Sequence, residues 1–211
     1  MDAPYQDVTD QIRTAYDGRA AWRDLQEKAD WKQAERAGFL RRLQDEGCSR
    51  LLEVGAGTGQ DSVFFRDHGL DVVAIDLSPA MVARCREKGI DGRVMDVARL
   101  GFPPDSFDAV YTLNCLLHVP NARLPAVLEA IAGLIRPGGL LFLGLYGGRD
   151  EEGIADDDNY DPPRFFSWRT DEQIQQFARR RFDIVDFHVV APERQHFQSL
   201  TLRRPSRRSG A

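Results

Sequence analysis

Short hydrophobic runs alternate with amphipathic segments along most of the chain. Runs of four to eight apolar residues that end at glycine, proline or polar residues are typical of buried strands, and apolar residues three or four positions apart are typical of helices. Because strands that alternate with helices form parallel crossovers, we predict an α/β fold with a mostly parallel sheet. The predicted strands are 51–54, 71–76, 92–97, 107–113, 140–146, 182–190 and 196–202, and the predicted helices end near 69, 88, 135 and 180.

The residues before the first strand are predicted to be helical from about position 7. Val8 and Ile12 share one helical face, and a second, highly charged helix has a thin apolar stripe that includes Leu40 and Leu43. The last two strands follow each other directly and predict an antiparallel terminal hairpin. We therefore expect a helical extension at 1–46, one main domain at 47–203 and a disordered basic tail at 204–211.

Residues 147–169 are long for a connection inside a compact domain, and they include an acidic stretch at 149–161. The acidic side chains have two interpretations. They form a solvated, mobile loop, or they attract a cationic substrate. We expect the mobile loop.

The first predicted strand runs into three alternating glycines, Gly55, Gly57 and Gly59. Glycine allows a positive φ and leaves no Cβ between the backbone and a ligand, and the amides at the start of the next helix face whatever lies over the turn. The spacing predicts a cofactor cradle. A dinucleotide fingerprint would place glycine or alanine where Gln60 stands, and the Gly-Lys-Ser/Thr of a phosphate-binding loop is absent.

Acidic residues end the next two strands. Asp76 lies about twenty positions beyond the first glycine, the spacing at which an acid reaches a ribose in this architecture. Ser78, followed by Pro79, already provides the cap of the next helix, so the Asp76 carboxylate is free to accept from both ribose hydroxyls. Asp96 ends the third strand. It is a second candidate for a ligand contact, and the alternative is that it only initiates a turn.

Composition and charge narrow the possible functions. The chain has 211 residues, 42% of them hydrophobic, and a net charge of −5, which argues against a broad nucleic-acid surface. No apolar run approaches the ~20 residues of a membrane span, and the first residues lack the layout of a signal peptide, so we expect a cytoplasmic protein. The three cysteines form no Cys-x-x-Cys pair and the four histidines show no metal-ligand spacing, so we expect no metal site.

The pattern Glu53-x-Gly55-x-Gly57-x-Gly59 resembles the first motif of class I S-adenosylmethionine-dependent methyltransferases of the small-molecule type. Phe-Pro-Pro-Asp-Ser-Phe-Asp-Ala-Val at 102–110 and Arg-Pro-Gly-Gly at 136–139 are similar to later stretches of that family, and the terminal hairpin matches its sheet. The resemblance implies a Rossmann-like three-layer αβα sandwich with a seven-stranded sheet in the order 3-2-1-4-5-7-6. It also implies S-adenosylmethionine as cofactor and S-adenosylhomocysteine as product.

The same resemblance assigns cofactor contacts. Glu53 and the turn residues would hold the methionine portion, Asp76 the ribose, and Asp96 with Val97 the adenine. Asn114 ends the fourth strand beside the turn, where open α/β sheets place their ligands. The full set of expected cofactor residues is Glu53, Gly55, Ala56, Gly57, Gly59, Asp76, Leu77, Met81, Asp96, Val97 and Asn114.

Methyl transfer needs alignment, exclusion of water and, for some acceptors, a base. His118 is the candidate base because its ordinary pKa lies near neutrality, and a role in shaping the acceptor site is the alternative. The expected acceptor-site residues are Tyr16 and Trp22 from the helical extension, with His118, Tyr146 and Trp168. A small organic acceptor is expected, with neither a nucleic acid nor a membrane as partner, and the oligomeric state, monomer or homodimer, stays open. The alternatives are a non-catalytic S-adenosylmethionine binder and a dinucleotide-dependent oxidoreductase.

Overall fold

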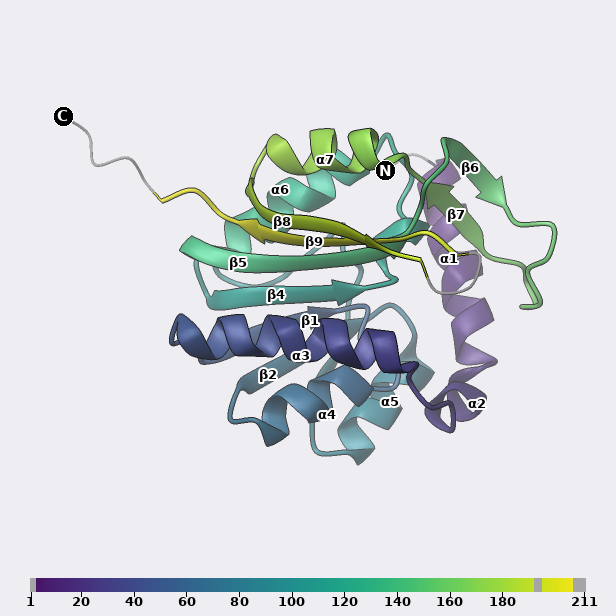
Figure 1. The fold of residues 1–211 in the computed structure, drawn as a ribbon. Coiled ribbons are helices and arrows are strands. Elements are labelled where there is room, and N and C mark those ends of the chain that lie inside the picture. The colour runs from purple at the N-terminus through teal and green to yellow at the C-terminus, as the bar shows by residue number, and fades with distance from the viewer. Residues whose placement is uncertain (1–2, 192–194, 207–211) are drawn as a thin grey trace.

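The computed structural model describes residues 3–191 and 195–206. Seven strands form one sheet in the order β3-β2-β1-β4-β5-β9-β8, in which β1 to β5 run parallel and β9 runs antiparallel to both β5 and β8 (Figure 1). Counted within this sheet alone, the order is the predicted 3-2-1-4-5-7-6. The strands are β1 Arg50–Val54, β2 Asp71–Asp76, β3 Asp91–Val94, β4 Phe107–Leu113, β5 Ile135–Tyr146, β8 Asp183–Val190 and β9 Phe197–Arg203.

Helices cover both faces of the sheet, as the predicted three-layer sandwich requires. Side chains alternate along each strand, so that Leu51 packs with helix residues Leu43 and Phe65 on one face, whereas Leu52 packs with Ile131 and Ile174 on the other. The helices are α1 Ala3–Asp17, α2 Ala20–Asp24, α3 Asp30–Asp45, α4 Gln60–Asp67, α5 Pro79–Glu87, α6 Leu124–Leu134 and α7 Asp171–Arg179, with a short 3-10 helix η1 at Leu116–His118.

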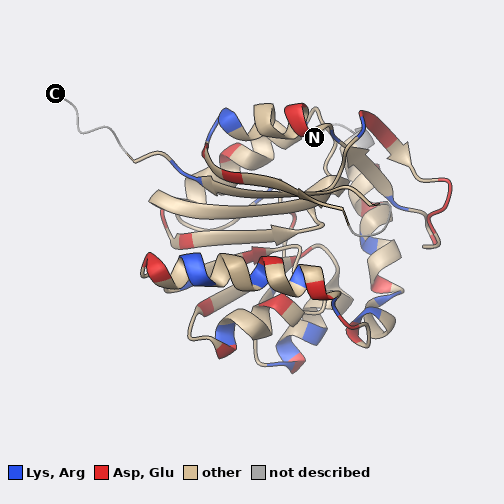
Figure 2. Ribbon diagram, in the orientation of Figure 1, with Lys and Arg blue, Asp and Glu red and all other residues tan. Residues whose placement is uncertain are grey.

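The extension before β1 forms three helices instead of the two expected. α3 lies along the sheet, whereas α1 and α2 cross the edge at which β4 ends (Figure 1). Gly18 and Arg19 separate α1 from α2, and residues 25–29 separate α2 from α3. Among the described helices none is both long and apolar enough to cross a membrane. Lys and Arg are interspersed with Asp and Glu along the helices in this view (Figure 2).

The segment expected to be a mobile acidic loop contains a second, two-stranded sheet. β6 Glu151–Ile154 pairs antiparallel with β7 Phe165–Trp168, and this hairpin lies beside α1 (Figure 1). Its acidic stretch is partly neutralised by Arg164, which pairs with Asp158. The strand β6 was not predicted because its sequence is mostly polar. Its pairing with β7, ten residues further along the chain, leaves no pattern in neighbouring residues.

Two further differences concern the ends of predicted segments. β5 begins at Ile135 and not at the predicted position 140, so it includes the Arg-Pro-Gly-Gly segment at 136–139, next to an irregularity of the β4–β5 pairing. At the C-terminus Arg204 is hydrogen-bonded to Gly139, since its N–H donates to the glycine carbonyl over 2.9 Å. The remainder of the expected disordered tail includes residues 207–211, which lie outside the described residues.

Candidate functional site

The carboxyl ends of the parallel strands open into one cavity of about 1100 Å³. The chain leaves β1 toward the face covered by α4 and leaves β4 toward the face covered by α6. Neighbouring strands whose connections diverge in this way leave a crevice at their carboxyl ends, which is where open α/β sheets bind ligands. The cavity is covered by α1, α2, the segment leading into α3, and the residues between β5 and β7.

The glycines after β1 have different roles. A Cβ on Gly57, where φ is +56°, would meet no atom within 4 Å, so the backbone of the turn is open to the cavity at this point. A Cβ on Gly55 would instead lie 2.3 Å from the Cβ of Cys115, and one on Gly59 would lie 2.9 Å from the Sγ of Cys85. Gly57 therefore leaves room for a ligand, whereas Gly55 and Gly59 allow elements to pack closely.

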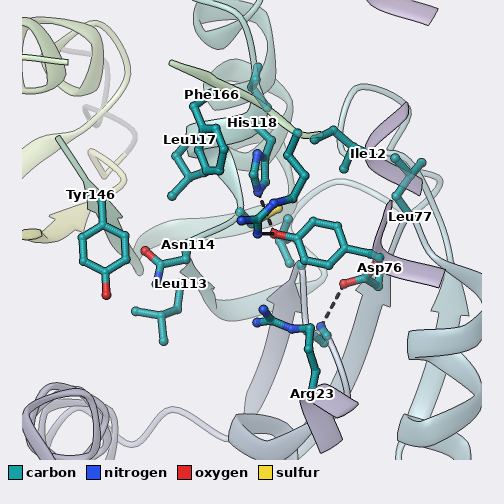
Figure 3. A pocket seen from close by; sticks show the side chains of 18 of the residues that line it. Ile12, Arg23, Asp76, Leu77, Leu113, Asn114, Leu117, His118, Tyr146 and Phe166 are labelled. Carbon is teal, nitrogen blue, oxygen red and sulfur yellow. Dashed lines mark hydrogen bonds between the residues drawn. The ribbon is translucent and has the colours of Figure 1, made fainter. Parts of the chain in front are cut away.

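Asp76 ends β2 with its carboxylate fixed by two backbone amides. The N–H of Gly57 donates to Oδ2 over 2.8 Å and the N–H of Ser78 donates to Oδ1 over 2.9 Å. Figure 3 shows Asp76 with one of these bonds. Burial raises the pKa of Asp76, while these two hydrogen bonds act in the opposite direction. Ser78 caps α5 as predicted, accepting from the Met81 N–H over 3.1 Å. The carboxylate at the cavity wall thus keeps further lone pairs for a ligand that carries hydroxyl donors.

Glu53 is a buried acid at the cavity wall, only 3% exposed. Ser62 donates a hydrogen bond to it. Burial, and then the charge of Asp61, raise the pKa of Glu53 to about 8. The carboxyl group is poised to become a stable carboxylate only when a cation is placed beside it.

We expect Glu53→Gln to flatten the pH dependence of stability in the ligand-free protein. A carboxyl whose pKa is higher in the folded state than in the unfolded state, here about 8 against 4.5, stabilises the fold below pH 4.5, and this contribution is lost as pH rises toward 8. The change in the midpoint of thermal unfolding between pH 5 and pH 8 should therefore differ between wild type and the variant. The expected difference is at least about 2–4 °C, which is the shift for about 1 kcal/mol in a chain of this size. Glu87→Gln, at an exposed acid, is the matched control, and an equal pH response of all three proteins would contradict the effect.

Most of the predicted cofactor residues lie together at this cavity. Those that line it are Glu53, Gly55, Ala56, Gly57, Asp76, Leu77, Asp96, Val97 and Asn114. Gly59 and Met81 do not line it, which corrects their predicted place. Met81 is 0% exposed because α5 turns this side chain into the protein interior, and Gly59 starts α4 against α5.

Asn114 has a side-chain oxygen that suggests a ligand. Its φ is +53°, in the left-handed region that asparagine adopts more readily than most residues, and its N–H donates to the Gly144 carbonyl over 2.7 Å. Its Oδ1 is buried and accepts no hydrogen bond from any described residue. An unmade hydrogen bond of this kind costs about 1–3 kcal/mol, so the oxygen is suited to a donor supplied by a bound molecule.

A hydrogen-bonded network joins α1 to the β6–β7 hairpin over the cavity. The Tyr16 hydroxyl lies 2.7 Å from Nε2 of His118 and accepts from Nη1 of Arg164 over 3.1 Å. Arg164 is also bound to Asp158, whose side chain is 2% exposed, with Nη2 2.6 Å from Oδ1. Tyr16 therefore reaches the cavity as predicted, and its position is fixed by partners more than a hundred residues away in the chain.

The tautomer of His118 follows from its two contacts. Nδ1 lies 2.7 Å from the carbonyl oxygen of Phe165, which can only accept, so Nδ1 carries the proton. Nε2 then accepts from the Tyr16 hydroxyl. Burial lowers the pKa of His118 to about 3, so the ring is neutral at physiological pH. His118 thus orients Tyr16 and has no free lone pair for an acceptor unless Tyr16 moves away.

The remaining predicted acceptor residues also line the cavity. Tyr146 is the last residue of β5, and Trp168, at the end of β7, stacks on Phe166 at 5.1 Å with an interplanar angle of 14°. Trp22 also lines the cavity, yet it is 49% exposed. Figure 3 shows Tyr146 and Asp76 on opposite sides of the view, with Asn114 between them.

Sequence reasoning missed several charged residues of this site. Arg23, Lys32 and Arg164 line the cavity, but each lies in a segment of mixed charge where a cation has no local distinction. Tyr5 was missed as well, although its hydroxyl donates to Oδ1 of Asp96 over 2.9 Å. No signal in the sequence identifies these residues, since all of them reach the site through long-range packing.

Comparisons with known proteins agree with this arrangement. A family model described as a methyltransferase domain matches residues 51–139. The ubiquinone biosynthesis O-methyltransferase of Xanthomonas campestris pv. campestris is 40% identical over 102 residues, which cover 45% of this chain and 42% of that protein. The chain spans less than half the length of the curated relatives that it matches first.

Solved structures share the fold over almost the whole chain. The 1,6-didemethyltoxoflavin-N1-methyltransferase of Burkholderia thailandensis, crystallised with 1,6-didemethyltoxoflavin and S-adenosylhomocysteine, has a TM-score of 0.72 at 22% identity and covers 98% of this chain and 92% of its own. The [4+2]-cyclase SpnF also has a TM-score of 0.72, at 21% identity, and covers 94% of this chain and 97% of its own. Because one of these proteins is named for methyl transfer and the other for a cyclisation, the fold alone does not decide the reaction.

Proposed function

Because the chain belongs to the class I S-adenosylmethionine-dependent methyltransferase family, we propose that it binds S-adenosylmethionine and transfers the methyl group to a small organic acceptor. One observation carries this proposal. The Asp76 carboxylate and the open turn at Gly57 lie at a single cavity with the Asn114 oxygen, which has no partner among the residues that the structure describes. The cavity continues to an aromatic end beside Tyr146.

The residues present fit the cofactor. Asp76 has lone pairs for the two ribose hydroxyls, and Asp96 with Val97 would hold the adenine. Glu53 and the Asn114 oxygen suit the ammonium group of the methionine portion, since a cation would stabilise the Glu53 carboxylate. When bound, S-adenosylmethionine supplies a methyl group that is already activated on a sulfonium sulfur.

The protein then contributes alignment and exclusion of water. Tyr16, fixed by His118 and Arg164, forms part of the cavity wall. A fixed wall of this kind restricts the acceptor to poses in line with the transferring group, which lowers the barrier through orientation. We assign His118 to the positioning of Tyr16 in place of direct proton removal, since burial lowers the pKa of His118 to about 3.

Calorimetric titration with S-adenosylhomocysteine, with NADH and NADPH in parallel, tests the cofactor. We expect S-adenosylhomocysteine to bind in the micromolar range or tighter and neither nicotinamide cofactor to bind. Binding of a nicotinamide cofactor would support the oxidoreductase alternative, and absence of all binding would remove the proposed function. A screen of small amines, phenols and carboxylic acids for methylated products then separates an enzyme from a non-catalytic binder.

We expect Tyr16→Phe and His118→Ala to lower the turnover number by similar factors of about ten, the effect of one lost hydrogen bond of about 1.4 kcal/mol. The affinity for S-adenosylhomocysteine should stay close to that of wild type in both. Since the two residues act as one unit, the double variant should be no slower than either single variant. A large loss in His118→Ala alone, together with a wild-type rate that follows the titration of a histidine, would assign His118 as the base.

Several expectations from the sequence belong to this proposal. They are the cytoplasmic location, the lack of a nucleic-acid partner, and the division into an extension at 1–46, a main domain at 47–203 and a tail. RNA-binding assays test the lack of a nucleic-acid partner, and limited proteolysis tests the division of the chain. The mixed charges of the helices in Figure 2 support the absence of a broad basic surface.

A further inference from the structure

We propose that Lys32 binds an anionic group of the acceptor, a carboxylate or a phosphate carried on a flat ring, at the β5 end of the cavity. The inference rests on the proposed function, because it treats this end of the cavity as the acceptor site. It narrows the acceptor from any small organic molecule to one class.

Lys32 is an unpaired cation in the cavity wall. Among the described residues none forms an ion pair or a hydrogen bond with its ammonium group. Other cations of the same wall have carboxylate partners: Lys28 is bound to Asp61, Arg164 to Asp158, and Arg149 to Glu151. Burial of a cation without a counter-ion is unfavourable, so a bound anion would relieve a cost that the other three do not carry.

The surroundings of Lys32 are aromatic. Its Nζ lies 5.2 Å from the ring centroid of Trp31 and 5.2 Å from that of Tyr146. Trp31 in turn contacts Tyr146 edge-on at 6.3 Å and Phe197 at 4.7 Å. An ammonium group among ring faces and edges suits a ligand that combines a flat apolar body with a negative charge.

The position of Lys32 assigns it to the acceptor. Its neighbour Tyr146 ends β5 and lies across the view from Asp76, the expected ribose ligand (Figure 3). Among the described residues Arg23 also has no carboxylate partner, and its charge acts on the pKa of both Asp76 and Lys32. The contact of Lys32 with Tyr146 therefore assigns Lys32 to the acceptor, and Arg23 stays available for the carboxylate of the cofactor.

Electrostatics at Lys32 favour an anion. Burial, and then the charges of Lys28 and Arg23, lower the pKa of Lys32 to about 8, while Asp61 acts in the opposite direction. The nearby Tyr146 hydroxyl stays neutral, because burial raises its pKa. The protein thus holds a net positive charge at this point, and affinity for an anion should fall as pH rises through about 8 and Lys32 loses its proton.

The test uses benzoate and phenyl phosphate as anionic probes, with benzamide and phenol as neutral ones. Calorimetric titrations are run on the full chain with and without saturating S-adenosylhomocysteine. We expect wild type to bind benzoate, phenyl phosphate or both about tenfold more tightly than the matching neutral probe, the effect of one charge-assisted hydrogen bond. Lys32→Gln should remove the preference and Lys32→Arg should keep it.

Lys28→Gln is the matched control, since it removes a lysine of the same wall that is already paired, and it should keep the preference. Circular dichroism checks the fold of each variant. No binding of either anion, equal binding of anions and neutral probes, or a preference that survives in Lys32→Gln would overturn the proposal. So would a loss of S-adenosylhomocysteine affinity in Lys32→Gln with the anion preference intact, which would assign Lys32 to the cofactor. A separate titration of wild type with S-adenosylhomocysteine tests the proposed function, so a failure of that cofactor product to bind is distinguished from a failure of the Lys32 proposal.

Discussion

Asp76→Ala should weaken S-adenosylhomocysteine binding by at least about 100-fold. A carboxylate that accepts from two hydroxyls contributes about 1.5–3 kcal/mol for each charge-assisted hydrogen bond, and 2.7 kcal/mol corresponds to a factor of about 100. The variant should still fold. It leaves the amides of Gly57 and Ser78 without their acceptor, but it also removes a buried carboxylate whose pKa is raised by burial. Titration calorimetry on the folded variant measures the effect.

Two further variants of β2 make this result specific. Asp76→Asn keeps the shape of the side chain and one acceptor oxygen, so we expect an intermediate loss of about tenfold. Asp71→Ala removes an exposed acid at the opposite end of the same strand and should leave the affinity unchanged. Wild-type affinity in a folded Asp76→Ala protein would falsify the ribose assignment.

Gly55→Ala should destabilise the protein by about 2–5 kcal/mol. Ala in a left-handed conformation, here at φ +72°, costs about 1–2 kcal/mol, and overpacking costs about 1–3 kcal/mol. Overpacking applies because the added Cβ would lie 2.3 Å from the Cβ of Cys115 and 2.4 Å from its Sγ. The midpoint of thermal unfolding should fall by roughly 5–15 °C.

Gly57→Ala is the matched comparison, two residues further along the same turn. Its Cβ would meet nothing within 4 Å, so only the backbone strain of about 1–2 kcal/mol remains. Its methyl group would project into the cavity and should reduce S-adenosylhomocysteine affinity well beyond its effect on stability. In the double variant Gly55→Ala/Cys115→Gly, loss of the Cys115 side chain should restore part of the stability. A Gly55→Ala protein as stable as wild type would show that Cys115 moves aside at little cost.

Local patterns in the sequence carry the fold and the cofactor end of the site. The apolar runs of β1, β2, β4 and β5 are buried on both faces, so they stand out as continuous hydrophobic segments. The glycines after β1 and the acid that ends β2 lie at fixed positions relative to these runs. Parallel strands share one carboxyl edge, which is why residues predicted separately, such as Gly57, Asp76 and Asn114, meet at one cavity.

The acceptor end was decided by tertiary structure. Trp22 and Tyr146 were expected there as aromatic residues near the site, but Lys32 was recognised only because the structure shows which cations have partners. Histidine is a residue type that often acts as a base, so His118 was a candidate from the sequence. Its contacts with Tyr16 and Phe165 show instead a neutral ring that orients Tyr16.

The sequence by itself therefore determined where the strands of the main sheet and the helices between them follow one another along the chain. It also determined the cofactor turn and the acids that face it, because each depends on residues close together in the chain. Tertiary structure decided the β6–β7 hairpin, the network of Tyr16 with Arg164, and the contact between Gly55 and Cys115. These features join segments 10 to about 150 residues apart, and their energies depend on burial and on partners. A pattern of neighbouring residues contains no record of either quantity.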